Sequence, residues 1–358
     1  MLLNEFALCH FLFENGYLNR NQFVHGKVRL VRQFSRNRNF KVLISEGKNL
    51  LIKQPKLSFY LRKPDLKREA DLYWLTFNDK DFSRLKNHIP QFYHYDRNIQ
   101  ALITELIEPA ISLHEYHVSL NEYPASIAVK QAEILAALHS IELNKIEHKK
   151  SASLFSMKPC WLFNIESDGW WAGVNTEANR QLMELVKSQI DFMNSIRSAK
   201  EKWKLKCLVH NDIRWSNFLI RNLTDEAKEI RLIDWELSDF GDPCWDLAGI
   251  LQSYFSYWVL QHEADPFQLL KMKPAIAAFI SAYTDLMKLT EEKSDNMFHL
   301  SMEFTGLRLV QSCIEHVNFH NVLDRKTIQL LQFSLNILKD PKQAFDDFIL
   351  SRSKKQKV

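Results

Sequence analysis

The sequence predicts an α+β protein of two lobes, in which a small β-rich lobe is followed by a larger helical one. Apolar and polar side chains alternate along residues 28–54, as they do in β-strands. Later the apolar period becomes that of α-helices, over residues 126–141, over 176–204 and from 267 onward. A strand-rich start and a helical remainder indicate two lobes, with the boundary near residues 108–115.

Length and composition fit this division. The chain has 358 residues, of which 46% are hydrophobic, and this is enough for a sizeable core. Its 24 Phe and 9 Trp favour a folded protein over a disordered one. We expect an N-terminal lobe at residues 1–108, a C-terminal lobe at 109–350 and a short basic tail at 351–358.

The elements of the first lobe can be placed in order. An amphipathic helix is expected first, ending near Asn15–Gly16. Strands follow in "VRLVRQFS", "RNRNFKVLIS" and "LLIKQ", and Glu46–Asn49 forms a turn before the last one because its glycine tolerates positive φ. Residues 66–77 carry apolar side chains at helical spacing, and residues 99–108 are expected to form a buried strand.

Several classes of protein are disfavoured by the sequence. The five cysteines are widely spaced and include no C-x-x-C pair, so neither a disulfide framework nor a structural zinc site is expected. A reducing compartment suits them, and we expect a cytoplasmic protein. The apolar N-terminus contains Glu5 and has no basic residue before it, so it is not expected to be a signal peptide or a membrane span.

The net charge of +4 is small but unevenly distributed. Between Arg20 and Arg68 there are fourteen Lys or Arg against two acidic residues. This segment is either a solvated basic face or a phosphate-binding lobe. No RNA- or DNA-binding motif accompanies it, so a nucleic acid is not an expected partner. No oligomeric state is predicted.

Polar residues follow two apolar strands late in the chain. The strand in "CLVHND" leads into Asp212, "NFLIR" begins at Asn217, and "IRLIDWE" leads into Asp234. The last two strands read as a hairpin-like pair, which would bring these three side chains to one edge. Phosphoryl transfer needs an in-line hydroxyl and phosphates neutralised by Mg²⁺, a cation that prefers oxygen ligands. Asn217 and Asp234 suit the metal, and Asp212 suits the proton of the hydroxyl, at the kinase spacing D-x-x-x-x-N.

These segments resemble the aminoglycoside phosphotransferase and choline kinase-like family. "HNDIRWSN" is similar to its H-G-D-x-x-x-x-N loop, and "LIDWELSDFGDPCWDLA" is similar to its I-D-W-E, G-D-P and D-L-A segment. The resemblance implies a bilobal protein-kinase-like fold and an ATP- and Mg²⁺-dependent transfer to a hydroxyl of a small molecule. It also implies that the metal-binding aspartate is Asp234, and that the literal D-F-G at 239–241 is a coincidence in a loop.

The same comparison assigns supporting residues. Asp246 is expected to be a buried carboxylate that receives hydrogen bonds from the catalytic loop, and His210 is expected to brace that loop. The family's strand lysine and helix glutamate correspond to Lys53 and Glu69, for which a pair of surface charges is the alternative. His139 is taken as a core residue.

The resemblance places the adenine against "LITELIE", where the backbone of Glu105 to Ile107 would form the hinge. No glycine lies between Gly26 and Gly47, so the turn over the phosphates is not glycine-rich. "SRNRN" takes its place, and Ser35 and Asn37 are expected to bend this turn and to offer donors.

The acceptor is left open by the sequence. Neither part of the second lobe that could form its pocket is strongly acidic, so charge does not favour an aminoglycoside. Trp170 and Trp171 either form a cation–π wall or pack beneath a loop, and the orientation of Glu236 is open. A protein or peptide acceptor and a catalytically silent scaffold are the alternatives. The absence of an A-P-E segment disfavours the first, and the presence of all the expected site residues disfavours the second.

Overall fold

The structure is a computed structural model, and it divides into two compact units. The first comprises Met1–Ser112 and Phe218–Ser238, and the second comprises Leu113–Asn217 and Asp239–Val358. The structure describes residues 3–34, 37–55, 66–146, 153–166, 176–221 and 228–350.

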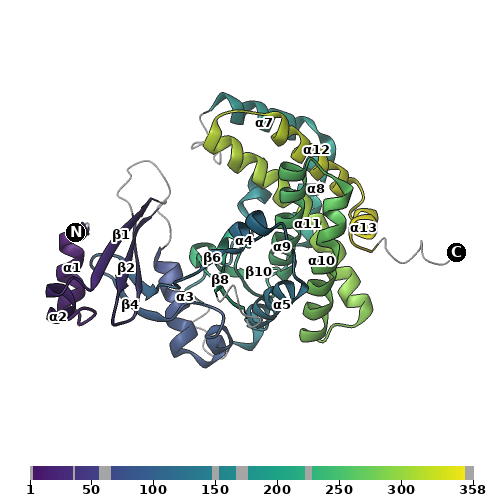
Figure 1. The fold of residues 1–358 in the computed structure, drawn as a ribbon. Helices are drawn as coiled ribbons and strands as arrows, with labels where there is room; N and C mark the ends of the chain where they lie inside the picture. Colours follow the sequence, from purple (N-terminus) through teal and green to yellow (C-terminus); the bar gives the residue numbers. More distant parts are fainter. Residues whose placement is uncertain are drawn as a thin grey trace. The chain divides into compact units, whose positions relative to one another are not determined.

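The strands lie mainly in the first unit and the helices mainly in the second (Figure 1). The strands are β1 Val28–Phe34, β2 Arg38–Ile44, β3 Leu50–Gln54, β4 Phe92–Asp96, β5 Ala101–Glu105, β6 Ile111–Ser112, β7 Cys207–Val209, β8 Phe218–Arg221, β9 Glu229–Leu232 and β10 Asp239–Gly241. The helices are α1 Glu5–Glu14, α2 Arg20–Val24, α3 Leu66–Asn78, α4 Leu113–Leu120, α5 Ala125–His139, α7 Glu177–Ser188, α8 Ile190–Lys202, α9 Pro243–His262, α10 Pro266–Leu286, α11 Glu291–His320, α12 Arg325–Lys339 and α13 Pro341–Phe345.

The first unit is built on a five-stranded antiparallel sheet in the order β1-β2-β3-β5-β4. The alternation read from the sequence buries Phe40, Val42 and Ile44 of β2. Helix α1 adds Leu8 and Leu12 to the same core, next to these strands (Figure 1). The three expected strands, the N-terminal helix and helix α3 are therefore confirmed.

One expected strand differs from the structure. Residues 99–108 contain strand β5 only at Ala101–Glu105, and the preceding strand β4 was not predicted. All five residues of β4 are partly exposed, so its sequence "FYHYD" lacks the burial pattern that marks a strand. Beyond β5 the chain leaves the sheet.

A second, three-stranded sheet has the order β6-β8-β9 and belongs to the first unit. Strands β8 and β9 pair antiparallel, with Phe218 opposite Leu232, so the expected hairpin is confirmed. Because β6 pairs with β8, residues 218–238 join the first unit, although they follow more than a hundred residues of the second unit in the chain.

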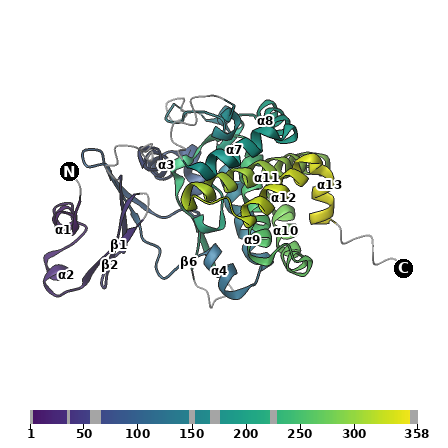
Figure 2. The same cartoon turned by 90° about the horizontal axis from the view of Figure 1, so that it is seen from above.

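The second unit is a helical assembly. Helix α5 packs against α10 (Figure 1), and the long α11 packs against both α9 and α12 (Figure 2). The helical pattern at 176–204 forms two helices, because the chain leaves helical geometry at Gln189. No helix in the described part of the chain is both long and apolar enough to cross a membrane.

Two elements of the second unit differ from the sequence analysis. The D-F-G tripeptide is strand β10, which pairs antiparallel with β7, so the expectation of a loop at 239–241 is wrong. Helix α9 was not predicted. It begins at Pro243 behind the N-cap Asp242, and most of its residues are buried, so its sequence has no polar face to reveal the helical period.

Candidate active site

In the first unit, Lys53 on strand β3 binds two carboxylates. Its Nζ lies 2.8 Å from Oε1 of Glu69 on helix α3 and 3.1 Å from Oδ1 of Asp234, which follows strand β9. Lys53 is 9% exposed and Glu69 only 1%. Three residues that the sequence analysis assigned to phosphate and metal binding therefore meet at one ammonium group.

The cluster of Lys53 with its two carboxylates is largely buried and is held together by opposite charges. Burial alone would lower the pKa of Lys53, but the carboxylates of Glu69 and Asp234 raise it, and the net direction is upward. The ammonium therefore stays charged at neutral pH. Removing one partner of a buried pair leaves an uncompensated charge, so these residues depend on one another.

Asp234 reaches Lys53 through an unusual backbone conformation. Its φ of 70° and ψ of 59° are left-handed, a region that a short polar side chain such as Asp tolerates better than most. The next residue, Trp235, is fully buried and donates from Nε1 to the carbonyl of Leu232 at 3.0 Å. The short turn Trp235–Leu237 that it begins packs against α3, the helix that carries Glu69. Glu236 lies in this turn, half-buried.

In the second unit, the loop His210–Asn217, here called the Asp212 loop, runs from β7 to the start of β8. The Asn217 amide donates from Nδ2 to the backbone carbonyl of Asp212 at 2.8 Å and to its Oδ2 at 3.1 Å. These bonds fix the orientation of the amide. Its Oδ1 has no partner in the described part of the chain and remains available as a ligand atom.

Asp246 supports the Asp212 loop from helix α9. Its carboxylate is fully buried and accepts hydrogen bonds from the backbone N–H groups of His210 at 2.6 Å and Asn211 at 2.9 Å. Burial would raise the pKa of this carboxyl, but the hydrogen bond from His139 and the nearby His210 lower it. The side chain of His210 accepts at Nδ1 from the N–H of Asp212, 3.2 Å away.

His139 does more than fill the core. Its Nε2 lies 3.4 Å from Oδ2 of Asp246, and its Nδ1 lies 2.7 Å from the hydroxyl of Tyr283 on α10. Both His139 and Tyr283 are buried. A chain of hydrogen bonds therefore runs from helix α10 through His139 and Asp246 to the backbone of the Asp212 loop.

A residue that the sequence analysis missed, Arg308 of α11, also holds this loop. Its guanidinium donates to the carbonyls of Asn211 at 3.3 Å and Ile213 at 2.8 Å, the two neighbours of Asp212. It lies 5.1 Å from the ring of Trp245 and is 1% exposed. The available signal was a single arginine in the apolar run "TGLRLV", which is unusual in a buried helix.

Arg214 was missed as well, although it lies within the loop motif. Its Nε donates to Oδ1 of Asp212 at 2.8 Å, and its Nη2 contacts the same oxygen and Oε2 of Glu315, the latter at 3.3 Å. Burial would lower the pKa of Arg214, but the carboxylates of Asp212 and Glu315 raise it. Arg214 therefore joins the Asp212 carboxylate to helix α11.

The carboxylate of the literal D-F-G has a different environment. Asp239 is buried and accepts from the hydroxyl of Ser156 and from the backbone N–H groups of Met157 and Phe240, both at 2.8 Å. These donors tie residues 156–157 to strand β10. The bonds are those of a structural carboxylate.

Of the other residues that the sequence analysis expected at the site, some lie in the described part of the chain and some do not. Asn37 is buried just before β2, whereas Ser35, Trp170 and Trp171 lie outside the described residues. Glu105 ends β5, and its N–H donates to the carbonyl of Gln91 at 2.8 Å.

Ile107 follows β5 and is the other residue expected at the hinge. The preceding residue, Leu106, donates its N–H to the carbonyl of Asn49 at 3.0 Å. The N–H of Ile107 itself makes no hydrogen bond within the described part of the chain.

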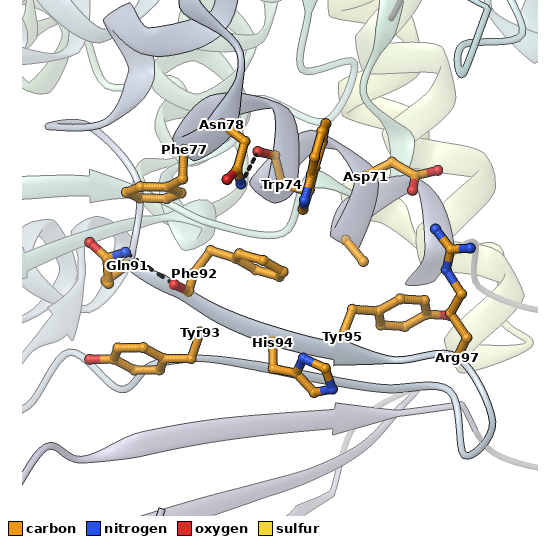
Figure 3. Close-up of a pocket in the computed structure, with 11 residues that line it drawn as sticks. Asp71, Trp74, Phe77, Asn78, Gln91, Phe92, Tyr93, His94, Tyr95 and Arg97 are labelled. Carbon is orange, nitrogen blue, oxygen red and sulfur yellow. Dashed lines mark hydrogen bonds between the residues drawn. The ribbon is translucent and has the colours of Figure 1, made fainter. Parts of the chain in front are cut away.

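The first unit also contains a cavity of about 570 Å³, away from Lys53. It is formed by α3 and the segment around β4, with Trp74, Phe77, Phe92 and Tyr95 on its walls and Asp71 at one end (Figure 3). Asn78 and Gln91 both donate to backbone carbonyls there, of Trp74 and Phe92. It contains none of the residues expected to bind nucleotide or metal.

The fitness of the site for a metal rests on its donor set. No group of three or more His, Cys, Asp or Glu that could hold a metal occurs among the described residues. Mg²⁺ does not require one, since it usually keeps several waters and takes one or two protein oxygens. Each unit offers an oxygen of this kind, the amide oxygen of Asn217 in the second unit and the partly exposed carboxylate of Asp234 in the first.

The chain is similar to several known proteins. An ethanolamine kinase from Plasmodium vivax has a similar structure, with a TM-score of 0.57 and 17% identity, over 97% of this chain and 91% of that one. This likeness confirms the predicted kinase-like fold. Acyl-CoA dehydrogenase family member 11 is 28% identical in Mus musculus and 26% identical in Rattus norvegicus, over 134 residues, or 37% of this chain. The matched segment spans 16% of the length of those relatives.

The decisive comparison is with a family model. The model described as the phosphotransferase enzyme family, APH, matches residues 27–272, which is well over half of the chain. This range includes the Asp212 loop and the strand and helix that carry Lys53 and Glu69. The resemblance read from the loop motifs is confirmed, and the chain belongs to the APH phosphotransferase enzyme family.

Proposed function

We propose that this protein is an ATP- and Mg²⁺-dependent kinase that transfers the γ-phosphoryl group to a hydroxyl of a small molecule. The observation that carries the proposal is the contact of Lys53 with both Glu69 and Asp234. These residues come from three separated parts of the chain, and a kinase needs a lysine for phosphates, a glutamate to hold it and an aspartate for metal.

Each residue then has a role. Lys53 binds the α- and β-phosphates, and Glu69 fixes its position. Asn217 and Asp234 would hold Mg²⁺, which would supply positive charge against the phosphates. Adenine bonds to the backbone of Glu105 and Ile107, and the turn with Ser35 and Asn37 covers the phosphates.

The transfer itself is a displacement at the γ-phosphorus. The oxygen of the acceptor hydroxyl forms a bond to this phosphorus, the bond to the β,γ-bridging oxygen breaks, and ADP leaves with that electron pair. Asp212 orients the hydroxyl and accepts its proton, which then passes to solvent. Asp246, His210 and Arg308 keep the backbone around Asp212 in place for this step.

The alternatives have less support. A silent scaffold usually lacks one of the lysine, base or metal residues, and this chain has all of them. A peptide acceptor would suit a longer segment after Asp234 that includes an A-P-E motif, and none is present in the sequence. All five cysteines are free, which suits the cytoplasmic location that we propose.

Nucleotide-dependent thermal stabilisation tests the proposal. ATP should raise the melting temperature of the wild type in the presence of Mg²⁺, and Asp234→Ala should lose the part that depends on Mg²⁺. Asp239→Asn, which changes the carboxylate of the literal D-F-G, is the matched control. This variant should keep the Mg²⁺-dependent part of the stabilisation. Wild type that gains no stability at millimolar ATP would refute the proposal and favour the scaffold.

A further inference from the structure

A cavity of about 320 Å³ lies beside the Asp212 loop, entirely within the second unit. Its walls are Arg214, Trp215 and Ser216 of the loop, His114 of α4 and one stretch of α9 that includes Tyr257. This volume is near the lower end of the range for small-molecule sites, which is about 300–1,000 Å³. The cavity therefore has the size for a small acceptor beside Arg214, the residue that binds the proposed base Asp212.

The lining combines an apolar floor with polar donors. The rings of Trp215 and Tyr257 have centroids 5.5 Å apart, and His114 meets Tyr257 edge-on at 6.1 Å. Apart from His114 and Arg214, the polar residues of the lining, such as Ser216, carry hydroxyl or amide groups. Among the described residues that line the cavity there is no aspartate or glutamate, so a cation would find no carboxylate on these walls.

Arg214 is the charged group that the cavity offers. A guanidinium has five N–H donors in a fixed fork. Asp212 and Glu315 engage Nε and Nη2, and in the described part of the chain Nη1 has no partner. The side chain is 40% exposed, so this nitrogen can meet a ligand while the two carboxylates hold the guanidinium in place.

We propose that the acceptor of this kinase is a small hydroxylated organic anion, and that Arg214 binds its anionic group while Trp215 and Tyr257 contact its carbon chain. The planar fork of arginine matches the oxygens of a carboxylate or phosphate. Because the same guanidinium also binds Asp212, an anion on Nη1 brings a nearby hydroxyl toward the base. The proposal rests on the proposed function and names its substrate class.

The chemistry is that of the same transfer. The hydroxyl oxygen of the anion bonds to the γ-phosphorus, ADP leaves with the electron pair of the broken bond, and the proton passes to Asp212 and then to solvent. The product carries a new phosphate monoester and keeps its original anionic group. A cationic amino alcohol would gain no bond from Nη1, because an ammonium group is a donor only and cannot accept its hydrogen bond.

A matched set of acceptors tests this inference on the full chain with ATP and Mg²⁺. A hydroxy acid, a diol and an amino alcohol of equal carbon number are compared by ADP release, with the phosphorylated product identified by mass spectrometry. We expect kcat/KM for the hydroxy acid to exceed that of the diol by at least about tenfold, and the amino alcohol to be poorest. A hydroxylated phosphate monoester in a parallel series shows which anionic group is preferred.

The variant Arg214→Gln tests whether Arg214 causes the preference for the hydroxy acid over the diol. Its general activity is expected to change, because Arg214 contacts Asp212, so the readout is the ratio of hydroxy acid to diol within each protein. This ratio should fall toward one in Arg214→Gln and recover in part in Arg214→Lys. Arg180→Gln, which changes an exposed arginine on α7, should leave it unchanged.

A binding measurement tests the inference even if the turnover of every acceptor is low. A carboxylic acid without the hydroxyl should stabilise the ATP-loaded wild type against heat, and should fail to stabilise Arg214→Gln. Preference for the amino alcohol, a ratio that Arg214→Gln does not change, or no binding of the carboxylate would each overturn the inference. Phosphorylation of a cation would refute this inference alone, whereas absence of Mg²⁺-dependent ATP binding would refute the proposed function.

Discussion

Replacing Glu69 by leucine measures how much the Lys53 cluster contributes to the free energy of unfolding. The change removes the carboxylate 2.8 Å from Lys53 and leaves Asp234, at 3.1 Å and partly exposed, as the remaining partner. Breaking a buried ion pair costs about 3–5 kcal/mol, because the other charge stays buried. With Asp234 still in place we expect the lower end, a loss of about 3 kcal/mol in the free energy of unfolding.

Urea unfolding of three variants provides the measurement, followed by both fluorescence and circular dichroism so that two-state behaviour can be checked. Lys67→Gln breaks the exposed pair with Asp71 on the same helix and should cost less than about 1 kcal/mol. The double variant Lys53→Met with Glu69→Leu removes both charges and should recover most of the loss, although activity is abolished. A single-variant loss below about 1 kcal/mol, or a double variant no more stable than Glu69→Leu, would refute the reasoning.

Arg308→Met removes the donor to the buried carbonyl of Ile213, and an unsatisfied buried carbonyl costs about 1–3 kcal/mol. Steady-state kinetics should show kcat falling more than the KM for ATP changes, with partial recovery in Arg308→Lys; unchanged kcat would contradict this. Burial lowers the pKa of His117 to about 4, against about 6.5 in unfolded chains. Because the unfolded chain then binds the proton more readily, the free energy of unfolding should be at its full value above pH ~6.5 and fall by about 3 kcal/mol toward pH 4. Urea midpoints across this range should be flatter in His117→Phe. Asp239→Asn should leave ATP turnover within a few-fold, whereas Asp234→Asn should lower it by at least about a hundredfold, and equal losses would contradict the assignment.

The sequence was informative where local pattern and burial agree. Strand β2 alternates because one face of the sheet is buried, and α3 shows helical spacing because one of its faces is buried. The candidate residues Lys53, Glu69 and Asp234 could be selected because each stands in such an element at a recognisable place. Their mutual contact is a property of the tertiary fold, which joins residues 16 and 181 positions apart.

Other features could not be read from the chain for physical reasons. Helix α9 is buried on nearly all sides and so has no polar period, and strand β4 is half-exposed on both faces. Arg308 lies about a hundred residues from the carbonyls that it binds, and nothing local to it specifies those partners. Arg214 lies inside the motif at a position where the motif allows any residue, so the motif does not reveal its contact with Asp212.

In each unit, the residues of the proposed site are held in place by other residues of the same unit. In the first unit, Lys53 is fixed by carboxylates from a helix and a hairpin of the same unit. In the second, Asp246 binds the N–H groups of the Asp212 loop and Arg308 binds its carbonyls, so the backbone around the base is held by both kinds of group. Because these supports are buried and charged, loosening either is costly. If Arg214 binds the acceptor as proposed, specificity can change at this partly exposed position while the buried supports stay the same.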